Sequence, residues 1–258
     1  MIWWILRGLR KGIVTSKYPA NAEPAPNGYR GSVVVRDPES GKNAYTELCP
    51  TGAISVDEGR VRLDRARCIL CGACVIAAPE AFAFQADYRT ASRRKPALVR
   101  GGLSPDLDAA ELPATLAQQA GALKRSIHIR HVDAGSDGGE EWEIAALTNP
   151  YYDMQRLGLY FTMAPRHADV LLVTGVVTPS MVEPLRRAYE AMPFPKAVVA
   201  AGTDACSGGF AASAADLEMS GVDGVLPVDV YVPGSPPAPI AILHGLLLAA
   251  GIVSEEVA

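Results

Sequence analysis

The second half of the chain alternates between short, uniformly apolar runs and longer helical segments. The short runs, Val170–Thr174 and Ala197–Ala200, have the length and composition of strands that are buried on both faces. The longer segments, Met181–Met192 and Pro239–Ile252, have the length and spacing of helices. This alternation predicts an α/β doubly wound, flavodoxin-like domain with a parallel sheet. We expect its functional loops directly after the strands, at their carboxyl ends.

The start of the chain has a different pattern. Residues 1–17 carry apolar side chains at helical spacing, and the basic side chains point elsewhere. Trp3 and Trp4 widen the apolar face. A basic amphipathic helix with aromatic residues is typical of a segment that lies in a membrane interface or on a membrane subunit. We therefore expect residues 1–20 to form a docking helix, and the alternative is a terminal helix that packs on the protein's own core.

Composition indicates three segments in the rest of the chain. Residues 30–88 contain four of the five cysteines, and residues 124–258 contain the alternating strand and helix pattern. Between them, residues 89–123 are polar and contain Gly and Pro, with one helix expected at residues 109–123. We therefore expect a cysteine-rich domain, a linker and an α/β domain.

Charge and hydropathy exclude several classes of protein. The apolar runs are well below the roughly 20 residues that a helix needs to cross a bilayer, so we expect no transmembrane helix. The net charge of −4 argues against nucleic-acid binding, because neutralising phosphates requires a basic surface. A cleavable secretory signal is not evident either, so we expect a reducing compartment.

Three cysteines lie within seven residues, at Cys68, Cys71 and Cys74. They are too close in sequence for independent disulfides, and the spacing is typical of metal ligands. Residues 32–84 resemble a bacterial ferredoxin, in which the pattern C-x2-C-x2-C-x3-C-P occurs twice. The second run here lacks its fourth cysteine, and the first run retains only its fourth, Cys49. The four replaced positions hold Glu39, Lys42, Tyr45 and Ala78.

The ferredoxin resemblance implies which cysteines act together. In that family the fourth cysteine of each run binds the cluster of the other run. Cys49, Cys68, Cys71 and Cys74 are therefore the complete set for one 4Fe-4S cluster, and the replaced positions are the complete set for a second. Keeping four of eight cysteines at random would leave a complete set only about 2 times in 70 under that rule. The alternative is a structural zinc site on the same four thiolates.

The α/β half carries a second resemblance, in phrases that follow one another in order. Among them are residues 126–136, 150–153, 165–169, 173–175 and 227–234. They resemble the small electron-transfer subunit shared by respiratory complex I and membrane-bound NiFe hydrogenases of the formate hydrogenlyase kind. The first half then resembles the ferredoxin subunit of the same complexes, fused in front, as an α+β ferredoxin-like domain.

Members of the small-subunit family hold a proximal 4Fe-4S cluster on four cysteines, and this chain departs from them at all four positions. Asp137, Glu140, Asp204 and Ser235 occupy those positions. Carboxylate and hydroxyl oxygens are poor substitutes for thiolate at a sulfide cluster, so we expect no cluster there. Cys206 lies two positions past the ligand position.

Three interpretations of this vacated site stay open. It is a polar, hydrated remnant in a domain kept as a scaffold, part of a proton path with shifted pKa values, or a site for a hard cation such as Mg²⁺ or Ca²⁺. His128, His131 and His167 lie in family-like phrases, where a structural role is the default and a role at the interface with the large subunit is the alternative.

Together these resemblances predict a peripheral-arm subunit of a membrane-bound complex, with one 4Fe-4S cluster for electron transfer and no catalysis by the chain alone. The expected partners are a large hydrogenase-like or complex I-like subunit and membrane subunits, at the cytoplasmic face of the membrane. Nucleic acid is not expected as a partner. The alternative function is a structural subunit whose ancestral electron route has been lost and whose cluster only stabilises the fold.

Overall fold

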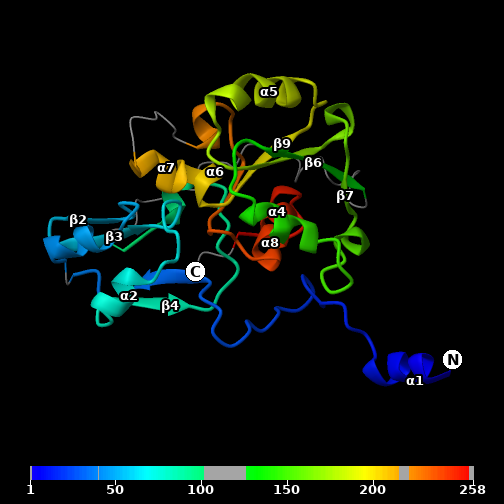
Figure 1. Cartoon of the computed structure of the whole chain (residues 1–258), viewed down its shortest axis with the longest axis horizontal. Coiled ribbons are helices and arrows are strands. Elements are labelled where there is room, and N and C mark those ends of the chain that lie inside the picture. Colours follow the sequence, from blue (N-terminus) through cyan, green and yellow to red (C-terminus); the bar gives the residue numbers. More distant parts are fainter. Residues whose placement is uncertain (1, 40, 102–125, 215–220, 256–258) are drawn as a thin grey trace.

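The structure is a computed structural model that describes residues 2–39, 41–101, 126–214 and 221–255 (Figure 1). The helix expected at residues 109–123, and with it most of the expected linker, lies outside the described residues. No helix in the described ranges combines the length and the apolar character needed to cross a membrane.

A five-stranded sheet forms the centre of the second half. Its strands are β6 (Ile127–Asp133), β7 (Leu159–Phe161), β8 (Val170–Thr174), β9 (Ala197–Ala201) and β10 (Val230–Val232). They lie in the order β10-β9-β8-β6-β7, and every neighbouring pair is parallel. Counted within the sheet, this is the order 2-1-3-4-5 of flavodoxin-like folds. The predicted α/β domain is confirmed.

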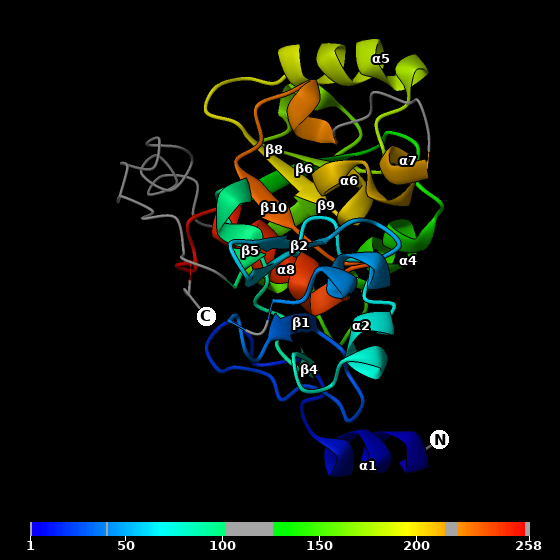
Figure 2. The same cartoon turned by 90° about the vertical axis from the view of Figure 1, so that its left-hand side faces the viewer.

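Helices cover both faces of this sheet (Figures 1 and 2). The residues of β8 and β9 are all buried, and successive side chains enter two different apolar cores. One core includes side chains of α4 (Gly139–Ala146) and α8 (Pro239–Ala249), and the other includes side chains of α5 (Pro179–Glu190) and α6 (Thr203–Ser207). The short α7 (Gly209–Ala214) follows α6.

The two predicted helices are present with shifted ends. The segment predicted from Met181 begins earlier, at Pro179, where the missing N–H of proline costs no helical hydrogen bond. The segment predicted to end at Ile252 ends at Ala249, and almost all of that helix is buried.

After α1 (Ile2–Lys11), the described part of the first half contains two small antiparallel sheets and one short α-helix. They are β1 (Ser32–Val35) with β4 (Phe82–Gln85), β2 (Ile54–Asp57) with β3 (Arg60–Asp64) and β5 (Val99–Arg100), and the helix α2 (Ala73–Ala77). Strands β2 and β3 are joined by Glu58 and Gly59, both at positive φ, as a two-residue hairpin turn requires.

The N-terminal helix α1 (Ile2–Lys11) projects away from the rest of the chain (Figures 1 and 2). Trp3 is 79% exposed and Trp4 is 69% exposed. The chain meets the body directly afterwards, because the Ser16 N–H donates to the Tyr151 carbonyl and Arg156 donates to the carbonyls of Ser16 and Tyr18. The apolar side of α1 is therefore uncovered, while the segment that follows it is held firmly.

Candidate functional site

The four predicted ligand cysteines come from two segments around the small core of the first half. Cys74 is buried on α2, and Cys49 and Cys68 pack against the same apolar core. Cys71 is exposed, in the loop between Cys68 and Cys74. Charges on the other three cysteines each raise the pKa of Cys68, so the four thiols lie close enough to interact.

Backbone N–H groups point at these sulfurs. The Ala53 N–H donates to the Cys49 sulfur at 3.2 Å, and the N–H groups of Leu70 and Val75 bond to the sulfurs of Cys68 and Cys74. Leu70 and Gly72 both have positive φ, and a Cβ at Gly72 would meet the Phe84 ring. The tight turn of this loop thus directs its backbone N–H groups toward the cysteine sulfurs.

These residues fit a 4Fe-4S cluster. In the described part of the chain, no three His, Cys, Asp or Glu side chains converge on the position of a single metal ion. A cluster has its four irons at different corners, so its ligands surround a volume rather than one point. Burial, followed by the neighbouring thiols, raises the pKa of Cys68 to about 12. Such thiols become thiolates when bound metal compensates for the burial.

The positions expected to have held a second ferredoxin cluster now have other contacts. Tyr45 is buried, stacks edge-on against Phe82 and donates a hydrogen bond to Glu80. Ala78 is buried in the same core, whereas Lys42 lies over the Tyr45 ring. Glu39 is at the surface in an ion pair with Arg60.

The positions where the resemblance expects proximal-cluster ligands all follow strands, at the carboxyl edge of the parallel sheet. Asp137 and Glu140 follow β6, Asp204 follows β9 and Ser235 follows β10. A Cβ at Gly202 would collide with the Glu140 carboxyl, and one at Gly209 would collide with that of Asp204. The sheet order therefore brings the three carboxylates close together, as expected for loops after parallel strands.

Burial differs sharply within this group. Glu140 is only 3% exposed, Asp204 is half-buried, and Asp137 and Ser235 are exposed. The Oε2 atom of Glu140 has no hydrogen-bond partner among the described residues. Burial raises the pKa of Glu140 to about 7, and Asp204 and Asp137 add to that rise. Burial also raises the pKa of Asp204.

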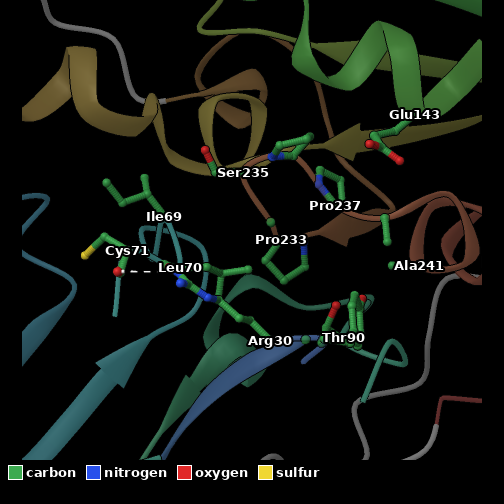
Figure 3. A pocket seen from close by; sticks show the side chains of 15 residues that line it. Arg30, Ile69, Leu70, Cys71, Thr90, Glu143, Pro233, Ser235, Pro237 and Ala241 are labelled. Atoms are coloured by element: carbon green, nitrogen blue, oxygen red, sulfur yellow. Dashed lines mark hydrogen bonds between the residues drawn. The ribbon is translucent and has the colours of Figure 1, made fainter. Parts of the chain in front are cut away.

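The cysteine site of the first half and the acidic site of the α/β half lie next to each other. The Thr203 hydroxyl donates to the Cys68 carbonyl and to the Gly234 carbonyl, both at 3.1 Å. Cys71 and Ser235 line one cavity of about 450 Å³. Figure 3 shows Cys71 and Leu70 on one side of this cavity and the Pro233–Pro237 segment on the other.

Arg30 and Glu143 also line this cavity. Arg30 donates to the carbonyl of Leu70 at 3.0 Å and lies over the Phe84 ring. Burial raises the pKa of Glu143. Arg30, which belongs to the first half, therefore holds the cysteine loop at the place where the loop faces the α/β half.

The three histidines take different positions. His131 bonds to the Thr174 hydroxyl at 3.0 Å, and that hydroxyl donates to Glu141 at 2.6 Å. Burial lowers the pKa of His131. His128 lies beside Asp169, and His167 is exposed. The contacts of His131 match the structural role taken as the default.

Sequence reasoning missed two residues beside the cysteines. Arg65 is only 6% exposed, and Cys68 is among the groups acting on its charge. Burial, followed by Arg100, lowers its pKa to about 10, so Arg65 remains positive at neutral pH. Neither this arginine nor Thr203 has a distinctive spacing in the sequence. Only the packing of the two halves against each other reveals their position.

Comparison with known families matches both halves. The family "NADH ubiquinone oxidoreductase, 20 Kd subunit" matches residues 138–249, and the family "4Fe-4S single cluster domain" matches residues 61–120. The second match includes Cys68, Cys71 and Cys74 but begins after Cys49. Inclusion of Cys49 among the ligands therefore depends on the geometry described above.

Among similar proteins is "Formate hydrogenlyase subunit 7" of Escherichia coli, 41% identical over 137 residues, which are 52% of this chain and 52% of that protein. "Probable membrane-bound hydrogenase subunit mbhJ" of Pyrococcus furiosus is 44% identical over 52% of this chain and 80% of that protein. A chain of a membrane-bound sulfane sulfur reductase, an archaeal respiratory membrane complex, is 31% identical over 52% of this chain and 76% of that chain, with a TM-score of 0.44. This chain spans about half the length of the Escherichia coli protein it matches.

Proposed function

Because this chain belongs to the family of the 20 kDa subunit of NADH ubiquinone oxidoreductase, we propose that it is an iron-sulfur subunit in the peripheral arm of a membrane-bound complex. It carries one 4Fe-4S cluster on Cys49, Cys68, Cys71 and Cys74 and is not catalytic alone. The observation that carries this proposal is the packing of Cys49, Cys68 and Cys74 around one small core, with backbone N–H groups directed at these three sulfurs and Cys71 in the adjoining loop.

A bound cluster would supply one-electron transfer, and the residues of this chain adjust that chemistry. The N–H groups of Ala53, Leu70 and Val75 donate to the sulfurs, which favours the more negative, reduced state. The positive charge of Arg65 acts in the same direction. The apolar core around Cys74 limits contact with water.

The α/β half acts as a partner-binding scaffold without a second cluster. Asp137, Glu140, Asp204 and Ser235 provide only oxygen atoms, which are hard ligands and poorly suited to iron and sulfide. An electron leaving a cluster bound at the four cysteines would then have to reach the large subunit in one long step, because this domain would offer no intermediate cluster.

Helix α1 docks the subunit on the membrane side. Its apolar side chains, including Trp3 and Trp4, are exposed, and Arg10 and Lys11 lie in its last turn. This combination suits the interface of an anionic lipid surface or a membrane subunit. The segment after α1 is fixed by Arg156 and Tyr151, so docking through α1 holds the whole body at the cytoplasmic face.

A second function is favoured by Asp137, Glu140, Asp204 and Ser235, which stand where the resemblance expects the cysteines of a proximal cluster. In it the cluster only stabilises the fold, and the subunit is a scaffold in a complex whose electron route has been lost. Redox titration of the intact complex distinguishes the two. An electron carrier is reduced by the physiological donor and reoxidised by the acceptor within one turnover. A cluster that remains oxidised while the complex turns over would support the scaffold.

A further inference from the structure

Glu140 is a buried carboxylate that the proposed electron transfer does not use. It lies in the first turn of α4, is 3% exposed, and one of its oxygens has no hydrogen-bond partner in the described ranges. A buried, ionised carboxylate without full hydrogen bonding is costly, and protonation removes that cost. The position therefore suits a carboxyl that gains and loses a proton.

The charged groups around Glu140 strengthen this tendency. Asp204 from α6, Asp137 from the loop after β6 and Glu141 from its own helix act on it, and all three are acidic. Burial is the largest cause and these charges add to it, so the pKa of Glu140 rises to about 7. Asp137 is exposed to solvent and close enough to Glu140 for its charge to act there. The side chain can therefore exchange a proton near neutral pH.

Glu140 is also connected to the four-cysteine site through a short stretch of backbone. Its carboxyl lies against Gly202, and the next residue, Thr203, donates a hydrogen bond to the carbonyl of Cys68. Thr203 is fully buried, so few water molecules can screen charge between the two places. A negative charge added at the cysteines would therefore act on Glu140 across buried protein rather than across water.

We propose that Glu140 is a redox-linked proton site that takes up one proton from water when the four-cysteine site takes up one electron. This inference rests on the proposed function. In the reduction step, a one-electron reductant gives its electron to the cluster, and the Glu140 carboxylate takes H⁺ from the solvent and becomes a carboxylic acid. Oxidation reverses both transfers, so charge and atoms balance.

The test is the midpoint potential of the cluster in the purified, cluster-loaded chain, titrated with dithionite between about pH 6 and pH 9. In the wild type the potential should fall as pH rises. The upper limit, one proton per electron, is a tenfold change in the reduction equilibrium per pH unit, or about 59 mV. Glu140→Gln should give a potential that is independent of pH. Glu183→Gln, which removes an exposed charge on α5, is the matched control and should keep the wild-type slope.

A second variant covers the case in which Glu140→Gln does not fold. Asp204→Asn removes one neighbouring charge and should move the pH-dependent region to lower pH without abolishing it. A reduced-minus-oxidised infrared spectrum should also show a protonated carboxyl band that is absent in Glu140→Gln. A wild-type potential that does not change with pH, or an unchanged slope in Glu140→Gln, would overturn the inference.

Two further outcomes separate this inference from the proposed function. A chain that holds four irons but has a pH-independent potential refutes only the proton site. A chain that holds no iron-sulfur cluster refutes both. Tight binding of Mg²⁺ or Ca²⁺ to the metal-free chain, lost in Glu140→Gln, would also refute the proton site, because the carboxylates would then be ionised.

Discussion

Replacing Glu140 by Gln should stabilise the fold at alkaline pH and have little effect in acid. The structure raises the pKa of this carboxyl from 4.5 to about 7, mainly by burial. A raised carboxyl pKa means that the folded state holds its proton more tightly than the unfolded chain does. The contribution of Glu140 to the free energy of unfolding is therefore fully present below about pH 4.5 and decreases as pH rises through about 7.

The magnitude follows from the same pKa change. A rise of roughly 2.5 at about 1.36 kcal/mol per pKa unit corresponds to about 3 kcal/mol in total, of which about 2 kcal/mol is lost between about pH 5.5 and pH 8.5. Glutamine has nearly the same shape and stays neutral, so Glu140→Gln avoids this loss. The variant should thus gain about 2 kcal/mol over the wild type across that interval.

The assay is urea unfolding of the cluster-loaded chain, followed by circular dichroism at several pH values. Glu183→Gln serves as the control, because Glu183 is exposed and pairs only with Arg187 one helical turn away in the contacts described. Its stability should follow the wild type at every pH. The reasoning is refuted if the difference between Glu140→Gln and the wild type is the same at pH 5.5 and pH 8.5.

Three other predictions concern docking, potential and turnover. Deleting residues 1–13 should release the protein from membranes without unfolding it, as measured by flotation and circular dichroism, and unchanged association with all partners present would contradict the docking role of α1. Arg65→Gln should lower the midpoint potential of the cluster, because a positive charge beside Cys68 is lost, whereas Arg65→Lys should largely retain the potential. Equal potentials in the wild type and in both variants would exclude electrostatic tuning by Arg65. If no proximal cluster forms at Asp137, Glu140, Asp204 and Ser235, the intact complex should lack rapid hydrogen evolution or uptake, because electrons would face one long jump. Fast hydrogen turnover by the purified complex would contradict this.

The central sheet could be predicted because the signal for each strand lies within a few consecutive residues. Strands β8 and β9 are continuous apolar runs, since both faces of a parallel strand are buried. The proximity of Asp137 and Asp204 follows from the same topology, because loops after parallel strands share one edge of the sheet.

Other features could not be derived from the sequence. The burial of Glu140 depends on Gly202, which leaves room for its carboxyl, and these residues are far apart in the chain. The bond from Thr203 to Cys68 depends on how the two halves pack together. Contacts of this kind leave no periodic pattern, because each involves a single side chain and a backbone group of a distant segment.

The measurement that tests the central claim most directly is the iron and acid-labile sulfide content of the purified chain, with its electron paramagnetic resonance spectrum after reduction. We expect about four irons and four sulfides per chain and one cluster signal. Cys71→Ser should abolish the signal, whereas Cys206→Ser, which changes a buried thiol near the Ala200 carbonyl, should leave it intact. Zinc in place of iron, about eight irons per chain, or a second signal lost on mutation of Asp137 or Asp204 would contradict a single cluster on these four cysteines.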